Sequence, residues 1–75
     1  MLKDNFLVSV FKTDVYNNAD ANIVLNQIQL TYPAMILNFD LEDCDKILRL
    51  EGQNYKEDDI VSILNKLGFS CEVLR

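Results

Sequence analysis

The sequence predicts an α+β domain with the element order β-α-β-β-α-β. Residues 35–51 alternate apolar and polar side chains in two runs, and the turn-forming residues Asp43, Cys44 and Asp45 separate them. A period of two with a central turn is typical of a β-hairpin. On each side of the hairpin lies a stripe of apolar residues at helical spacing, and each stripe is bordered by a further strand pattern.

The first predicted strand covers residues 5–13, where both faces are largely apolar, which favours a central position in the sheet. A helix is predicted over residues 19–31, with either Asn17 or Asn18 as its N-cap. Pro33 ends this helix because proline disfavours the helical conformation of the residue before it. Its core stripe consists of Ala21, Val24, Leu25, Ile28 and Tyr32.

The second half of the chain continues with the hairpin, a second helix and a last strand. We expect Gly52 to break the third strand. The acidic residues 57–59 suit the positive N-terminal end of the second helix, and Gly68 suits its C-terminal stop. Residues 69–74 read as the last strand, with Cys71 pointing inward.

These elements fit one economical topology. Each half of the chain is a strand-helix-strand unit, and such crossovers are almost always right-handed. The prediction is a ferredoxin-like sandwich, in which a four-stranded antiparallel sheet of order 4-1-3-2 carries both helices on one face. The 75 residues form a single domain, 1–75, whose core is too small to enclose a deep pocket.

The net charge and the composition of the chain argue against several classes of binding partner. Twelve acidic residues against seven basic ones give a net charge of −5, which argues against nucleic acid and anionic membrane surfaces. No apolar run approaches the ~20 residues that span a bilayer, and the N-terminus lacks a signal-peptide pattern. We therefore expect a cytoplasmic protein without membrane insertion.

Catalysis is not expected. The chain has no histidine, which removes the commonest general base and the commonest transition-metal ligand. The two cysteines, Cys44 and Cys71, are not in a metal-binding spacing and are predicted to be free thiols. We predict a protein that is not an enzyme and holds no cofactor.

Two runs of the second half resemble the heavy-metal-associated domain family. They are FDLEDCDKILRLEG, residues 39–52, and YKEDDIVSILNKLGFSCEVL, residues 55–74. The resemblance implies a ferredoxin-like fold and, in the family, soft-metal binding through a Cys-x-x-Cys pair after the first strand. Asn17 and Asp20 stand at those positions here, and an amide and a carboxylate do not replace soft thiolates. The metal site is therefore not carried over to this chain.

A hard-cation site built from oxygen ligands is a weaker hypothesis. The expected topology brings the end of the first strand and the hairpin tip to one end of the molecule, but the two loops start ~10 Å apart. The alternative interpretation is that these are solvated surface acids plus a helix cap. The candidate ligands are Asp14, Asn17, Asp20, Asp43 and Asp45.

The sheet face away from the helices is the stronger candidate for a site. It should alternate to polar residues, yet we expect several apolar side chains there, and exposed contiguous apolar surface marks interaction sites. The alternative is a sheet face that tolerates scattered apolar residues. The predicted interface residues are Leu7, Phe11, Ile36 and Ile47, with Leu74 on the same face.

Three functions stay open on this basis. The first is a non-catalytic protein-interaction or regulatory module that binds a protein partner or a second copy, as a homodimer, through the open sheet face. The second is a metal-binding or metal-delivery protein with altered ligands, similar to a copper chaperone. The third is a small-molecule-binding regulatory domain with ligands at a dimer interface.

Overall fold

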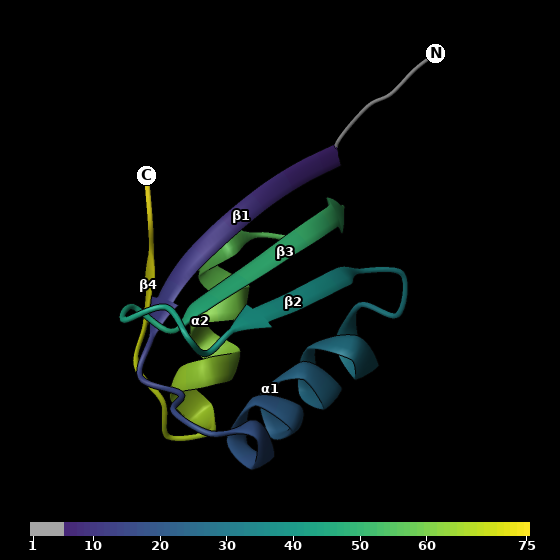
Figure 1. The fold of residues 1–75 in the computed structure, drawn as a ribbon. Helices are drawn as coiled ribbons and strands as arrows, with labels where there is room; N and C mark the ends of the chain where they lie inside the picture. The colour runs from purple at the N-terminus through teal and green to yellow at the C-terminus, as the bar shows by residue number, and fades with distance from the viewer. Residues whose placement is uncertain (1–5) are drawn as a thin grey trace.

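A computed structural model of the chain describes residues 6–75 and confirms the predicted α+β fold and element order (Figure 1). Residue 5, where the first strand was expected to begin, lies outside the described residues. The elements are β1 (Phe6–Thr13), α1 (Asn18–Thr31), β2 (Ile36–Asp40), β3 (Ile47–Gln53), α2 (Glu57–Lys66) and β4 (Cys71–Val73).

The four strands form one antiparallel sheet of order β2-β3-β1-β4, which is the predicted order read from the other edge. β3 lies opposite β1 with Phe11 against Leu48, and opposite β2 with Asn38 against Arg49. β4 pairs with β1 only at Phe11–Thr13. Figure 1 shows α2 behind β1 and β3, and α1 below β2 in this view, so the two described helices leave the opposite sheet face uncovered.

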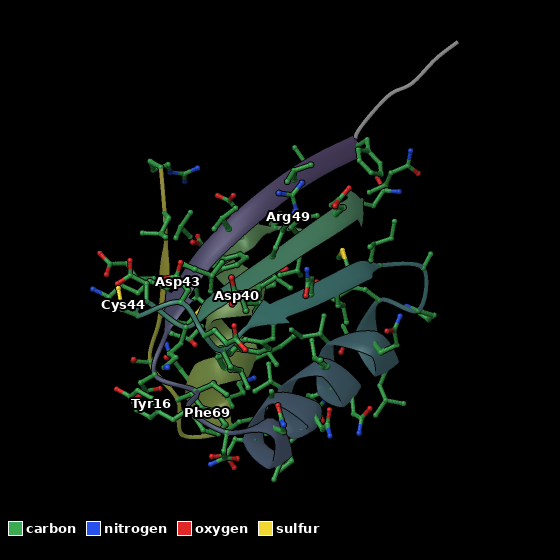
Figure 2. All side chains as sticks on the ribbon, viewed as in Figure 1. Tyr16, Asp40, Asp43, Cys44, Arg49 and Phe69 are labelled. Atoms are coloured by element: carbon green, nitrogen blue, oxygen red, sulfur yellow. The ribbon has the colours of Figure 1, made fainter. Side chains whose placement is uncertain are left out.

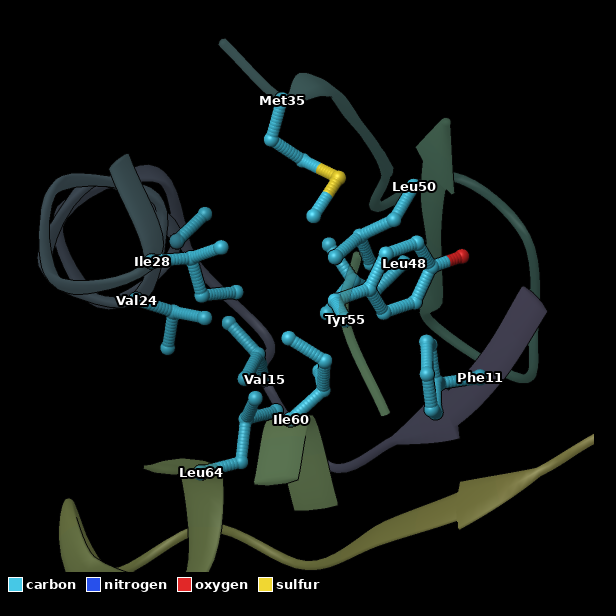
Figure 3. Packing of buried hydrophobic residues seen from close by; sticks show 11 residues of the cluster. Phe11, Val15, Val24, Ile28, Met35, Leu48, Leu50, Tyr55, Ile60 and Leu64 are labelled. Atoms are coloured by element: carbon cyan, nitrogen blue, oxygen red, sulfur yellow. The ribbon is translucent and has the colours of Figure 1, made fainter. Parts of the chain in front are cut away.

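The core lies between the sheet and the two helices (Figure 3). Val24 and Ile28 of α1 and Ile60 and Leu64 of α2 are fully buried, and they meet the inward side chains of β1 and β3. The burial of each side chain of this size stabilises the folded state by about 1.5–3 kcal/mol. This packing holds both helices on one side and leaves the other side of the sheet to solvent.

Local capping chemistry sets the helix ends as the sequence indicates. Asn17 is the N-cap of α1, and its side-chain oxygen accepts the backbone N–H of Asp20 at 2.8 Å. Gly68 follows α2 with φ of +96°, a conformation that costs glycine little. The Phe69 N–H then returns to the Leu64 carbonyl at 2.9 Å, which closes the end of the helix.

The expected break of the third strand at Gly52 is wrong, because β3 continues to Gln53. Gly52 pairs with Leu7 of β1 and is buried. A Cβ atom at Gly52 would lie 2.5 Å from the Sδ of Met35, so the missing side chain makes room for a core methionine. β4 is also shorter than the predicted 69–74.

The faces of β1 are opposite to those expected. Phe11 was predicted on the open sheet face, but it is fully buried among the core residues. Leu7 has the same parity as Phe11 and faces the helix-bearing side, where it borders Tyr55 near the start of α2. The open face is instead lined by the other set of β1 residues, Phe6, Val8, Val10 and Lys12.

Candidate interaction face

A row of apolar side chains runs along β1 on the open face of the sheet. We call it the β1 stripe and define it as Phe6, Val8, Val10 and Leu74. Leu74 joins the row because its N–H donates to the Val10 carbonyl at 2.8 Å, which places it beside Val10. Phe6 is 55 % exposed, Val8 49 % and Leu74 39 %. Large apolar side chains with such exposure on one face of a sheet make a candidate interaction patch.

Polar residues border the β1 stripe on the middle strands. Arg49 of β3 lies opposite Val10 and forms an ion pair with Glu51, with 3.3 Å between its Nε and the Glu51 Oε2. Figure 2 shows Arg49 and Asp40 on the strand face turned away from α2. At the β4 end of the sheet, Lys12 lies opposite Glu72 and within 3.8 Å of the Asp45 carboxylate. An apolar centre with a polar rim is the usual anatomy of a protein interface.

Ile36 and Ile47 lie on the open face as expected. Ile36 is 58 % exposed at the start of β2, but Glu51 lies between it and Val8. Ile47 is half-buried between Lys12 and Asp40. These two isoleucines therefore sit outside the β1 stripe, which is where the apolar residues are contiguous.

The first group of candidate metal ligands caps local structure. Asp14 accepts the backbone N–H of Ser70 at 2.8 Å through its Oδ1 and thereby holds the loop before β4. Asn17 caps α1 and also donates from Nδ2 to the Asp20 carboxylate at 3.2 Å. These oxygens therefore serve two local purposes, the loop before β4 and the N-cap of α1.

The second group lies at the tip of the hairpin (Figure 2). Ligand atoms of Asp43, Cys44 and Asp45 lie within 4.8 Å of one another. The Asp43 carboxylate accepts the Asp45 N–H at 2.8 Å, and Asp40 accepts two further backbone N–H groups of the tip. Such bonds are those of Asx turns, which shape the loop without any ion. Neither Asp14 nor Asp20 belongs to this group.

The two cysteines are free thiols in different environments. Cys44 is exposed at the hairpin tip, and Cys71 is half-buried in β4. Burial raises the pKa of the Cys71 thiol to about 11. Because the thiolate is the nucleophile and the metal ligand, this shift makes Cys71 a poor candidate for either role at neutral pH.

One buried polar network was not predicted. The Ser9 hydroxyl lies 2.6 Å from the Tyr55 hydroxyl and donates to the Glu57 carboxylate at 2.7 Å. Arg75 pairs with the same carboxylate at 3.0 Å. The partners are distant in sequence, and the available signal was Ser9, a polar residue of β1 between apolar neighbours. The network ties β1 to the start of α2.

Tyr16 follows β1 and is 69 % exposed. The Nζ of Lys46 lies 5.6 Å from the centre of its ring, a cation–π contact between this loop and the hairpin tip. The backbone joins the same two segments, since the Thr13 N–H donates to the Asp45 carbonyl at 3.1 Å. The two loops therefore lie closer than the expected ~10 Å, although their candidate acids stay apart.

Within residues 6–75, no helix is long and apolar enough to cross a membrane. Comparisons with protein-family models, with curated proteins and with solved structures found no match to this chain. The resemblance to heavy-metal-associated domains therefore stays a prediction, and the fold and surface of the molecule carry the functional argument.

Proposed function

We propose that this domain is a non-catalytic protein-interaction module that binds a protein partner through the β1 stripe. The observation that carries the proposal is the stripe itself, a contiguous apolar row on the sheet face that no helix covers. Transferring such side chains from water to a partner surface is favourable by about 25 cal/mol per Å² of apolar area.

The surroundings of the stripe support this proposal. The polar rim of Lys12, Arg49 and Glu51 offers both signs of charge to a partner and would orient it. Asp14, Asn17 and Asp43 are engaged in loop, cap and turn hydrogen bonds, whereas the stripe residues lie outside the buried core cluster. A role in binding explains why they are apolar.

The test compares two substitutions of the same kind. Val8→Glu places a charge in the stripe, and Ile23→Glu places one on the exposed side of α1; the two side chains are 49 % and 51 % exposed. We expect that proteins co-purifying with the wild-type domain and with Ile23→Glu are depleted at least tenfold with Val8→Glu.

Equal retention of every co-purifying protein by both variants would contradict the proposal. Circular dichroism and urea unfolding of the two variants provide the folding control. Both positions are exposed, so we expect each variant to stay folded with stability within about 1 kcal/mol of the wild type.

A further inference from the structure

The outer edge of β2 is a second surface, separate from the β1 stripe. β2 stands at the end of the sheet and pairs only with β3 among the described strands. An edge strand presents a row of unpaired backbone N–H and C=O groups, which can template pairing with another strand. Which residues present these groups follows from the register of the sheet.

The direction of the backbone groups can be traced from β4 inward. The Val10 carbonyl accepts an N–H from Leu74, on the β4 side of β1. Backbone groups alternate along an antiparallel strand, so those of Phe11 point to β3, and those of its partner Leu48 point to β1. The backbone groups of Arg49, the next residue of β3, therefore point to β2.

The same alternation continues into β2. Asn38 is the partner of Arg49, so its backbone groups point to β3. Those of its neighbours Leu37 and Phe39 consequently point outward, away from the sheet. The edge thus offers two N–H and two C=O groups, which belong to Leu37 and Phe39.

The β2 edge lacks three of the usual protections against pairing. Edge strands are commonly protected by lysine, proline or a bulge, and Ile36–Asp40, with the sequence ILNFD, contains none of these; its one charged residue, Asp40, stands at the end of the strand. A groove of about 450 Å³ flanks the edge and separates it from α1. Half-buried Leu25, Leu37 and Phe39 lie along this groove, so an added strand would also cover apolar surface.

We propose that this edge pairs with the β2 edge of a second copy of the chain, in antiparallel orientation around a two-fold axis at Asn38. In this register Leu37 of each copy lies opposite Phe39 of the other, and the outward backbone groups satisfy one another through four hydrogen bonds. All five residues of β2 are paired. The two sheets join into one sheet of eight strands, with all helices on the same face.

The side chains of β2 are complementary to themselves in this register. On the helix-bearing face, Leu37 meets Phe39 of the second copy, a favourable aliphatic–aromatic cross-strand pair. On the open face, Asp40 meets Ile36 of the second copy, so no carboxylates are opposed. The two Asp40 residues lie ~14 Å apart, given ~3.4 Å per residue along a strand and ~4.8 Å between strands. That separation exceeds the Debye length of ~8 Å at physiological salt.

A disulfide tests the register directly. Asn38 and its copy form a non-hydrogen-bonded pair with ~4.5 Å between Cα atoms, within the range that a disulfide spans. In a Cys44→Ser background, we expect Asn38→Cys to give a covalent dimer under mild oxidation. Ile36→Cys in the same background is the matched control, because its two copies would lie ~14 Å apart.

The mass of the unmodified protein provides the second measurement. Sedimentation velocity over a concentration series should show the wild type passing from monomer to dimer. We expect Asn38→Asp to raise the dimer dissociation constant at least about tenfold, because it sets two carboxylates face to face. Within the monomer that carboxylate faces Arg49, so the fold is retained. Gln53→Glu, exposed on β3, is the control for the added charge.

Each outcome decides the proposal. A wild type that stays monomeric up to millimolar concentration would overturn it, as would equal cross-linking of the two cysteine variants. A dimer lost with Val8→Glu and untouched by Asn38→Asp would place self-association on the β1 stripe and reject the β2 edge. Dimerisation that weakens with Asn38→Asp but not with Gln53→Glu, together with selective cross-linking at position 38, would support it.

Discussion

Ser9 is a polar residue at an inward position of β1, and only 3 % of its surface is exposed. Its hydroxyl forms hydrogen bonds with both the Tyr55 hydroxyl and the Glu57 carboxylate. We expect Ser9→Ala to lower the free energy of unfolding by about 1–3 kcal/mol, because it leaves two polar partners without their hydrogen bond. Urea denaturation measures this loss.

Ser62→Ala is the matched control, because Ser62 is exposed on α2. Exposed substitutions of this kind usually change stability by less than about 0.5 kcal/mol. An equal effect of the two alanine substitutions would mean that the hydroxyl network contributes no net stability.

Ser9 also explains why the two faces of β1 were predicted the wrong way round. This is the one residue-level error that affects the functional site. Both faces of β1 are apolar, so hydrophobic alternation did not distinguish the core face from the open face. The core face carries Ser9 and Thr13, whose hydroxyls are satisfied inside the protein, while Phe6 and Val8 face solvent. Which face is inward depends on hydrogen bonds to distant residues, and these follow only from the tertiary structure.

The N-cap of α1 illustrates the opposite case, a local interaction that the sequence nearly specifies. Asn17 and Asn18 were both possible caps, and the structure uses Asn17. We expect Asn17→Ala to cost about 1 kcal/mol, because the Asp20 N–H loses its acceptor. Thermal and urea unfolding would measure the difference.

Asn18→Ala is the control at the neighbouring position. Asn18 is the first helical residue and is exposed, and alanine favours helices more than asparagine, so stability should stay constant or rise slightly. A larger loss for Asn18→Ala than for Asn17→Ala would contradict the assigned cap.

The helices and strands could be predicted wherever local chemistry dominates. The helix over 19–31 and the strands of the hairpin were found from periodicity, caps and turn residues. Gly52 was misread because glycine often ends strands, whereas here it gives space to Met35, which approaches from before β2. A glycine selected by a distant neighbour leaves no local pattern.

The topology of the whole molecule was predictable because few arrangements satisfy two right-handed crossovers and one core. The candidate site was only partly predictable. Its location on the open sheet face follows from the topology, and Ile36 and Ile47 lie there. The β1 stripe, by contrast, depends on the orientation of β1, and the free β2 edge depends on which backbone groups point outward.

The response of the protein to added metal ions separates an interaction module from a metal-binding protein. We expect chelator-treated protein to show no saturable rise in its unfolding midpoint when Zn²⁺, Ca²⁺ or Mg²⁺ is added. An ion that bound only the native state at 100 times its Kd would add about 2.7 kcal/mol, a shift that thermal unfolding resolves easily. The described candidate ligands argue against such an ion, because Asp14, Asn17 and Asp43 already accept backbone N–H groups.

A saturable stabilisation by one ion would refute this prediction, and a double substitution would then locate the site. Asp43→Asn with Asp45→Asn removes the charge of the hairpin-tip group while keeping an oxygen acceptor for the turn. Loss of the stabilisation in that variant would show that the tip binds the ion. If the stabilisation persisted in that variant, the charges of Asp43 and Asp45 would not be essential for binding. The ion site would then involve acidic residues outside the hairpin tip.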